Sequence, residues 1–414
     1  MNWLVPPNEL TPDQQRAIEL SPLNNIAITG GPGSGKTMVL VYRAQFLSKK
    51  YKTSPARYRI LVYTNILKDY IKSALNLLDL PEDNVLVFAN WCHLFHEKYI
   101  GRVPWNKSEN VPDFRLTQLN VKDYILSGRI DLPIYDFLMV DEGQDLDKDA
   151  FQIISRLAAH VTVCMDDKQQ IYETGISSSE IISALGIRRT NISFIEAFRV
   201  CPYIVKLASH FIPTKSEREA FEHQNRLPQV EKETPMFYLA RDFENEREML
   251  VSKIGERLLK NDRIVVLFPT NRQLYGFAMG MKEHGLDVEI PRKYRSRNEN
   301  GLNFSSSLPK LMTYFGAKGL TFDAVFMPRL LSQSFERFSE ARVEKLLFVG
   351  ITRATKWVYL STIDGNSLPA LDRLIQLEQS GSFSVVRHDQ FLIGNKAKPK
   401  ILDARAKKSD FDFL

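Results

Sequence analysis

Long hydrophobic runs are missing from this 414-residue sequence, and so are the features of an exported chain. No stretch of roughly eighteen apolar residues occurs, which excludes a membrane-spanning helix of ordinary length. The first ten residues, MNWLVPPNEL, lack the basic flank, the apolar segment and the small-residue cleavage site of a secretory signal. We therefore expect a cytoplasmic protein without a membrane partner.

Cysteine is scarce as well. The three cysteines, Cys92, Cys164 and Cys201, stand far apart, which excludes a disulfide scaffold and a paired-cysteine zinc site. Cys92 lies close to His93 and His96, but a single helical turn of this kind is more typical of packing than of a metal site. We interpret the three thiols as reduced and structural.

Neither sign of charge dominates the composition. Lysine and arginine number 55 against 49 aspartates and glutamates, so the net charge is +6 and the isoelectric point is about 9.0. With 44% hydrophobic and 25% charged residues, the chain has globular composition and enough length for two or three domains. A mild basic excess suits a polyanionic partner, but many soluble proteins share it, so charge alone identifies no partner.

Short apolar runs alternate with amphipathic stretches in the first part of the chain. This alternation is typical of parallel strands joined by crossover helices, and the segments are 25–29, 36–49, 59–64, 66–78, 137–140, 148–159 and 160–165. Residues 87–134 are richer in proline, asparagine and aromatic residues. The sequence therefore predicts a first α/β lobe over 1–86 and 135–190, with a small insertion at 87–134.

The same rhythm restarts after residue 190. Further strands are expected at 192–194, 236–239, 263–268 and 287–290, with helices at 243–259 and 272–284. The polar stretch 292–307 is typical of a loop. We expect a second α/β lobe over 191–385, followed by a basic and flexible tail at 386–414.

A glycine-rich string, GGPGSGKT at 30–37, stands between a predicted strand and a predicted helix, which is the context that a phosphate-binding loop requires. Glycines let backbone amides converge on phosphate oxygens, and the helix N-terminus adds positive potential. In this pattern Lys36 meets the β and γ phosphates, and Thr37 is a ligand of Mg²⁺. The residues predicted to bind the nucleotide here are Gly31, Gly33, Ser34, Gly35, Lys36 and Thr37.

Two carboxylates follow the apolar strand 137–140. Asp141 is placed to complete the Mg²⁺ shell, and Glu142 to orient or deprotonate the attacking water. An acidic pair after a strand is often a solvated turn, but beside a phosphate loop it indicates a catalytic pair.

The string DEGQD at 141–145 resembles the DEAQD signature of the UvrD, Rep and PcrA helicases of superfamily 1A. Further strings resemble that family's motifs in the family's order: LTPDQ at 10–14, KQQIY at 168–172, AFR at 197–199, GAKGLTFD at 316–323 and VGITRA at 349–354. The resemblance covers about residues 10–361. It implies two RecA-like P-loop NTPase lobes with parallel sheets, a small helical insertion in the first lobe, and the use of ATP with Mg²⁺.

The resemblance also implies roles for residues outside the phosphate loop. Gln14 would contact the adenine edge, and Gln169 would sense the γ-phosphate. Phe198 would stack on adenine, Arg199 and Arg353 would reach the γ-phosphate, and Gly319 would also contact the nucleotide. Arginines on the second lobe reach the transferring phosphoryl group when the lobes close, so hydrolysis would be coupled to motion.

Contacts to nucleic acid follow from the same resemblance. The residues concerned are Tyr63, Thr64, Asn65, Trp91, His93, Tyr172 and Lys318. Stacking of bases on aromatic rings does not select sequence, which suits a translocating enzyme. Tyr63 could equally belong to the core, because it ends an apolar strand.

The chain departs from the family in three places. After Tyr172 it lacks the usual aromatic-arginine pair, and Thr321 stands where the family has glutamate. The large second-lobe insertion is absent, since 199–313 leaves room for little beyond the lobe's own elements. These departures imply a shortened motor that lacks the large second-lobe insertion.

The leading hypothesis is an ATP-dependent translocase and DNA helicase on single-stranded DNA or a strand junction, with 3′ to 5′ polarity by resemblance. It could serve as the motor of a DNA repair or phage-defence complex. One alternative is a nucleic-acid-sensing ATPase switch that licenses a partner nuclease. Another is an RNA-directed motor, because nothing in the sequence tests for the 2′-hydroxyl.

Overall fold

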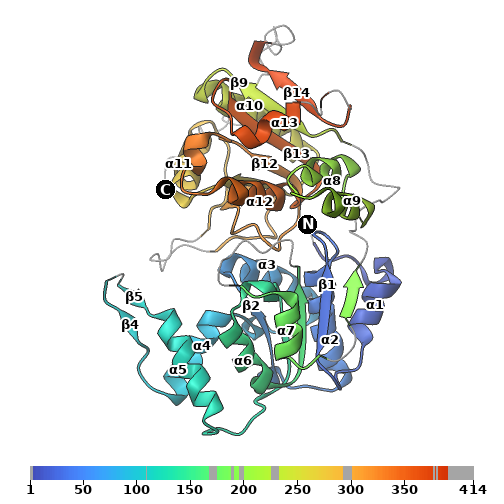
Figure 1. The fold of residues 1–414 in the computed structure, drawn as a ribbon, viewed down its shortest axis with the longest axis vertical. Helices are drawn as coiled ribbons and strands as arrows, with labels where there is room; N and C mark the ends of the chain where they lie inside the picture. The colour runs from blue at the N-terminus through green and yellow to red at the C-terminus, as the bar shows by residue number, and fades with distance from the viewer. Residues whose placement is uncertain are drawn as a thin grey trace, which may run out of the picture.

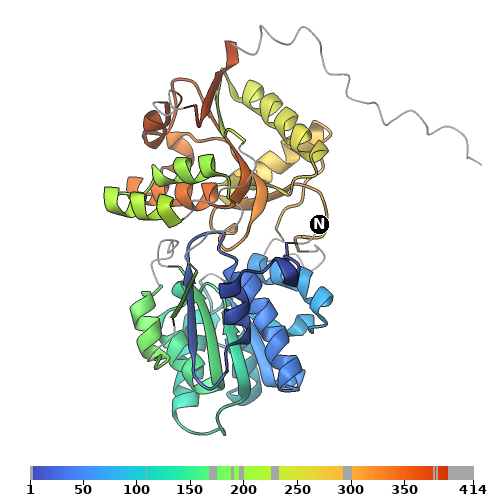
Figure 2. The same cartoon turned by 90° about the vertical axis from the view of Figure 1, so that its right-hand side faces the viewer.

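The computed structural model describes residues 3–108, 110–166, 175–187, 191–194, 200–224, 233–291, 301–375, 378 and 381–389. These residues form two α/β lobes, one above the other in Figure 1, and each lobe is built around a six-stranded sheet. Figure 2 shows helices along both sides of each sheet. The α/β fold class predicted from the sequence is confirmed.

The first lobe holds a wholly parallel sheet with strand order β3-β2-β6-β7-β1-β8. The strands at 26–30, 58–62, 85–87, 135–140 and 158–165 are apolar runs whose side chains are mostly buried, as expected for parallel strands covered by helices. The strands of this sheet are β1 (Ile26–Gly30), β2 (Tyr58–Val62), β3 (Val85–Val87), β6 (Tyr135–Val140), β7 (Ala158–Met165) and β8 (Asn191–Phe194). The covering helices are α1 (Pro12–Glu19), α2 (Lys36–Lys50), α3 (Asn65–Leu75), α6 (Lys148–Leu157) and α7 (Ser178–Ala184).

A small insertion leaves the first lobe after β3. It consists of α4 (Phe88–Tyr99), the two-stranded sheet of β4 (Trp105–Asn106) and β5 (Val111–Pro112), and α5 (Phe114–Leu126). Figure 1 shows the β4–β5 arm reaching away from the lobe body. Arg115 on α5 forms ion pairs with Asp147 and Asp149 at the start of α6, so the insertion is fastened to the lobe.

The second lobe repeats the architecture. Its parallel sheet has the order β11-β10-β12-β13-β9-β14. The strands are β9 (Met236–Ala240), β10 (Ile264–Phe268), β11 (Lys310–Thr313), β12 (Phe322–Met327), β13 (Ala354–Ile363) and β14 (Ser384–Arg387). The helices are α8 (Pro202–Ser209), α9 (Lys215–Gln224), α10 (Phe243–Leu259), α11 (Asn271–Glu283), α12 (Glu340–Ile351) and α13 (Asp372–Ile375).

The two sheets have the same topology. When the strands of each lobe are numbered along the chain, both sheets follow the order 3-2-4-5-1-6. By this correspondence β1, β2 and β6 of the first lobe match β9, β10 and β12 of the second. The loops that follow matched strands therefore occupy equivalent places in the two lobes.

Two sequence-based assignments need correction. The second lobe was expected to begin at residue 191, but β8 pairs with β1 and completes the first sheet. A four-residue apolar strand carries no signal that tells which sheet it joins. The strand expected at 287–290 is an isolated bridge between Glu289 and Lys310.

A buried arginine joins three elements of the first lobe. The Arg43 guanidinium, fully buried on α2, donates hydrogen bonds to the carbonyl oxygens of Ala17, Ile18 and Leu20 at the end of α1. It also bonds Thr162 Oγ1 (2.9 Å) and lies 3.1 Å from His160 Nε2, both on β7. Because these carbonyls lie at the end of α1, Arg43 fixes the position of this helix, which carries Gln14 in its first turn.

The buried network predicts a pH dependence of stability. Burial, and then the positive charge of Arg43, lower the pKa of His160 to about 3, against about 6.5 in an unfolded chain. Below pH 6.5, His160 therefore binds a proton in the unfolded state but stays neutral in the folded state. The free energy of unfolding consequently decreases as the pH falls below 6.5. From pH 7 to pH 5 this histidine should cost about 2 kcal/mol of unfolding free energy.

Urea unfolding at both pH values measures this cost. In His160→Gln, which keeps an acceptor for Arg43 but does not titrate, the difference between pH 7 and pH 5 should shrink by that amount. An unchanged difference would mean that His160 is charged in the folded state.

Among the described residues, no helix combines the length and the apolar character needed to cross a membrane.

Candidate functional site: a nucleotide cavity between the lobes

A cavity of about 460 Å³ lies between the two lobes. The first lobe contributes the phosphate loop, Gln14, Tyr70 and Glu142, together with Trp3, Val5 and Glu9 from the segment before α1. The second lobe contributes Arg263, Gly319, Thr321, Asp323, Arg353, Thr355 and Lys356. The cavity thus gathers residues that lie up to about 350 positions apart in the chain.

The phosphate loop joins β1 to α2, and the side chain of its lysine bonds to carbonyl oxygens of the loop itself. Lys36 Nζ donates to the carbonyl oxygens of Gly30 (2.7 Å) and Gly31 (3.0 Å), and it lies 3.8 Å from Asp166 Oδ2. Gly35 has φ 83°, a conformation that disfavours any side chain, and a Cβ there would lie 2.8 Å from Gln14 Nε2. The loop is therefore closed against the helix that carries Gln14.

Gln14 is held from both ends. Its side-chain oxygen accepts from the backbone N–H of Thr11, and Thr11 Oγ1 accepts from the Gln14 N–H, so the pair forms a capping box at the start of α1. Gln14 Nε2 donates to the carbonyl oxygen of Ser34 in the phosphate loop at 3.1 Å. An amide fixed at the cavity wall in this way is suited to contact a bound base.

The two carboxylates after β6 have different surroundings. Thr37 Oγ1 donates to Asp141 Oδ2 at 2.7 Å, so these two hard oxygen donors, which Mg²⁺ prefers, meet at the end of the phosphate loop. Burial, and then the neighbouring Glu142, raise the pKa of Asp141 to about 7. Burial also acts to raise the pKa of Glu142, but Lys318, Lys36 and Arg353 outweigh it and hold that pKa below its usual value.

Glu142 adopts a left-handed backbone conformation, with φ 50°, which is uncommon for a residue with a side chain. Such conformations cost of order 1–3 kcal/mol and gather at functional sites. Gln144 Nε2 donates to Glu142 Oε2 at 2.5 Å and so orients the carboxylate. The strained backbone and the glutamine together aim Glu142 into the cavity.

The loop from Tyr314 to Leu320 connects the second lobe to this carboxylate. Lys318, 3% exposed, forms an ion pair with Asp145 and lies 3.9 Å from Glu142 Oε2. A Cβ on Gly319, at φ 78°, would lie 3.2 Å from Glu142 Oε1. The lobes therefore meet at Glu142.

Arg353 reaches the same cavity from the end of α12. Its Nε donates to the carbonyl oxygen of Val349 (3.0 Å), its Nη1 to that of Leu320 (3.2 Å) and its Nη2 to Thr352 Oγ1 (3.1 Å). These bonds fix a buried guanidinium before any ligand is bound.

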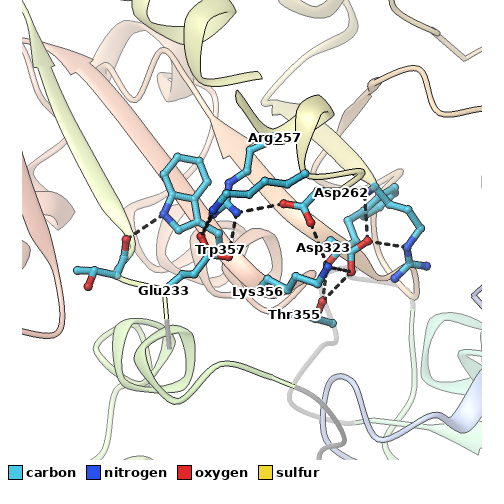
Figure 3. A network of polar contacts seen from close by, with 11 residues as sticks. Glu233, Arg257, Asp262, Asp323, Thr355, Lys356 and Trp357 are labelled. Atoms are coloured by element: carbon cyan, nitrogen blue, oxygen red, sulfur yellow. Dashed lines mark hydrogen bonds and ion pairs between the residues drawn. The ribbon is translucent and has the colours of Figure 1, made fainter. Parts of the chain in front are cut away.

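A polar network stiffens the second-lobe wall behind Arg353 (Figure 3). Lys356 forms ion pairs with Asp262 (3.0 Å) and Asp323 (3.6 Å), and Asp323 also pairs with Arg263 (3.0 Å). These ion pairs tie together the amino ends of β10, β12 and β13, which face the nucleotide cavity.

The same network extends away from the cavity to Arg257. This arginine is paired with Asp262 and Glu233, and its guanidinium carbon lies 4.2 Å from the centre of the Trp357 ring. The wall that carries Arg353 is therefore braced from behind.

The residues predicted to contact nucleic acid are scattered. Tyr63 is half-buried against the core, and Thr64 caps α3 by accepting from the Leu67 N–H, with Asn65 exposed beside it. His93 lies on α4, 3.5 Å from Glu97 of the same helix. Thr64 and Asn65 stand at the carboxyl end of β2.

Two of these predictions do not fit the structure. Trp91 is 4% exposed, and its Nε1 donates to the Tyr135 hydroxyl, so it offers no stacking face. Lys318 is buried between the lobes as described above, instead of facing a strand. Burial of this kind depends on helix packing and lobe contacts that a motif does not encode.

Four predicted site residues lie outside the described residues: Gln169, Tyr172, Phe198 and Arg199. The described parts of the chain show further cavity residues that the sequence did not single out, including Trp3, Tyr70 and Arg263. Trp3 stacks on Tyr70, with ring centres 4.5 Å apart. The only signal in the sequence for this part of the cavity is an aromatic residue, Trp3, ahead of α1. Its stacking partner Tyr70 on α3 could not be predicted from the sequence.

A phosphate loop, a carboxylate pair and an arginine from the opposite lobe define the class of P-loop NTPases with two RecA-like lobes. A family model for an AAA domain matches residues 14–175, and one for the UvrD-like helicase C-terminal domain matches residues 311–361. The two matches show that the chain is similar to the UvrD-like superfamily 1 helicases in both lobes.

Individual relatives carry related descriptions. A probable DNA helicase of Mycoplasma pneumoniae is 22% identical over 289 residues, covering 64% of this chain and 51% of that protein. The mitochondrial ATP-dependent DNA helicase HMI1 of Saccharomyces cerevisiae is 23% identical over 374 residues, covering 68% and 53%. The chain thus spans about half the length of these relatives.

Among solved structures, the C-terminal domain of a possible DNA helicase from Lactobacillus plantarum matches with a TM-score of 0.34 and 16% identity. That match covers 46% of this chain and 98% of that domain.

Proposed function

We propose that this chain is a DNA-dependent ATPase that moves along single-stranded DNA, hydrolysing ATP in the cavity between its lobes. The observation that carries the proposal is the convergence of Lys36, Glu142 and Arg353 on one cavity from two lobes. A catalytic site split between lobes ties hydrolysis to their closure, which is what a motor requires.

Each residue has a separate task in this proposal. Lys36 leaves the loop carbonyls to bind the β and γ phosphates, and Glu142 orients the attacking water and takes its proton. Thr37 and Asp141 would hold Mg²⁺, which neutralises phosphate charge when bound. Arg353 stabilises the charge that develops on the transferring group.

The repeated topology supports a strand path across both lobes. Thr64-Asn65 begins α3 after β2, and Thr270-Asn271 begins α11 after the matching strand β10. Both threonines cap their helices, accepting from Leu67 and Gln273 respectively. The remaining N–H groups of a helix N-terminus favour phosphate, so two equivalent phosphate contacts, one on each lobe, would follow the bound DNA strand.

The loop from Tyr314 to Leu320 lies next to both helix starts. The Tyr314 N–H donates to the Phe268 carbonyl just before Thr270, and a Cβ on Gly316 would lie 2.7 Å from Ile66 Cδ1. Lys318 in this loop pairs with Asp145 and lies near Glu142. Binding of DNA at the two helix starts would therefore be connected to the catalytic glutamate. Polarity of 3′ to 5′, a role in repair or phage defence, and a nuclease partner belong to the proposal as expectations.

Steady-state ATP hydrolysis tests the proposal. Single-stranded DNA should stimulate turnover strongly, and more than duplex DNA or single-stranded RNA. Glu142→Gln should stop hydrolysis while keeping nucleotide binding, because it spares Thr37 and Asp141. Turnover is measured by phosphate release and binding by a fluorescent ATP analogue.

Slow hydrolysis that none of the three nucleic acids stimulates would overturn the motor proposal and favour a nucleotide switch. If Glu142→Gln lost nucleotide binding as well, the division of labour between the two carboxylates would be wrong.

A further inference from the structure

The second lobe contains a cavity at the place that corresponds to the nucleotide site of the first. A space of about 430 Å³ is lined, among the described residues, by Phe243, Arg247, Gln273, Gly276, Phe277, Gly280, Arg329, Leu331, Gln333 and Ser334. These residues belong to α10, α11 and the segment after β12. By the matched topology, those elements are the counterparts of α2, α3 and the segment after β6, which hold the phosphate loop and the carboxylate pair.

The correspondence extends to single residues. Glu142 is the second residue after β6 and has φ 50°, while Arg329 is the second residue after β12 and has φ 59°. A left-handed residue that carries a side chain is uncommon, and its recurrence at matched positions marks a retained site geometry. At this point the second lobe has exchanged a carboxylate for a guanidinium.

Arg329 is held in place by a buried carboxylate. Glu246 accepts a hydrogen bond from the Arg329 N–H at 2.9 Å, forms an ion pair with Arg329 Nε at 2.8 Å, and accepts from Ser361 Oγ. The guanidinium lies 3.9 Å from the Phe243 ring centre and 5.5 Å from that of Phe277. The ion pair with Glu246 and the contact with the Phe243 ring hold the guanidinium at the cavity wall.

A second guanidinium and two glycines complete the cavity. Arg247 follows Phe243 by one helical turn on α10, and its Nη1 would lie 3.2 Å from a Cβ placed on Gly280. A Cβ on Gly276, one turn earlier on α11, would meet nothing within 4 Å. The missing side chains on α11 leave the space open. Two arginines line it, and each is paired with a glutamate, Arg247 with Glu244 and Arg329 with Glu246.

The features that hold ATP with Mg²⁺ in the first lobe are replaced here. Five residues separate β1 from α2, but two, Arg241 and Asp242, separate β9 from α10, so there is no glycine loop. Asp242 accepts from the Asn245 N–H and thereby fills the start of α10 with a carboxylate. None of the described residues that line the cavity is acidic, and the glutamates that pair with its arginines, Glu244 and Glu246, are not among them. The lining therefore offers no carboxylate to hold a metal ion.

We propose that this cavity binds one nucleotide unit without Mg²⁺, with the phosphate on Arg247 and Arg329 and the base against the Phe243 and Phe277 side. Arginine pairs bind phosphate through charge-assisted hydrogen bonds, and aromatic rings accept any base. The amides of Gln273 and Gln333 are placed to contact the base edge. The unit can come from a free nucleotide or from the bound strand, since both present the same chemistry.

Equilibrium dialysis of the full chain tests the site, using AMP in one arm and an eight-nucleotide oligothymidylate in the other, with EDTA present. All chains carry Lys36→Ala to weaken the first-lobe site, so loss of ATP turnover does not affect the outcome. Arg247→Gln and Gly276→Leu should each weaken binding of at least one ligand by about tenfold or more, and added Mg²⁺ should not strengthen it. Gly276→Leu fills the cavity without changing charge.

Lys282→Gln is the matched control, because it removes one positive charge from α11 away from the cavity. It should bind as the parent does, and the melting temperatures of all variants should agree. If both Arg247→Gln and Gly276→Leu weaken AMP binding, the ligand of the cavity is a free nucleotide. If they weaken only oligonucleotide binding, the ligand is a nucleotide of the DNA strand. Equal binding by parent, Arg247→Gln and Gly276→Leu in both arms overturns the proposal.

Discussion

Replacing Arg353 with alanine should lower ATP turnover by about 10³ to 10⁵, the range found for arginines that stabilise phosphoryl transfer. The guanidinium is already fixed by Val349, Leu320 and Thr352, so its charge is presented to the cavity without reorganisation. Nucleotide binding should weaken far less than turnover, because the charge that Arg353 stabilises develops in the transition state. Phosphate release under saturating ATP, with and without single-stranded DNA, gives the turnover rate.

The control for this prediction must separate chemistry from folding, since the three bonds of Arg353 also support the end of α12. Arg353→Lys keeps a positive charge but loses the planar fork, and it should remain strongly impaired. Arg337→Ala, an exposed arginine of the same lobe, should retain parent activity. A fall of a few fold in Arg353→Ala, at an unchanged melting temperature, would place the charge-stabilising group elsewhere.

The first-lobe half of the site was accessible from the sequence because its residues are local. The loop 30–37 needs a strand before it and a helix after it, and apolar periodicity indicates both. Asp141 and Glu142 follow another apolar strand in the same way. The structure brings these strings together at the Thr37–Asp141 hydrogen bond, across 104 positions of sequence.

Contacts between the lobes were not accessible. The motif around Lys318 was recognised, but its partner Asp145 lies 173 positions away and belongs to the other lobe. A lysine in such a motif can bind a phosphate or a carboxylate, so the residue type alone does not tell which partner Lys318 has. Trp91 was misjudged for a related reason, because its burial depends on α4 packing next to Tyr135 of β6.

The sequence predicted two α/β lobes but not the one-to-one match of their strands, although one signal for that match stands in the sequence. Thr-Asn stands at 64–65 and at 270–271, at both places after a short apolar run and before an amphipathic stretch, and it occurs once more at 190–191. Two residues are too few to indicate a repeat until the strand orders are known to match. Glu142 and Arg329 share no chemistry, and their equivalence follows from strand order and backbone conformation alone.

Replacing Lys36 with alanine should abolish measurable ATP turnover, a loss of at least about 10²-fold. Lys36 donates to the loop carbonyls of Gly30 and Gly31, and its transfer from them to the phosphates is the step that the substitution removes. Lys49→Ala, on the exposed end of the same helix, should leave turnover unchanged. Because Lys36 also lies near Asp166, melting temperatures must show that the loop still folds. Undiminished hydrolysis by a folded Lys36→Ala chain would show that the γ-phosphate is bound by another cation of the cavity, with Arg263, Arg353 and Lys356 as the residues to replace next.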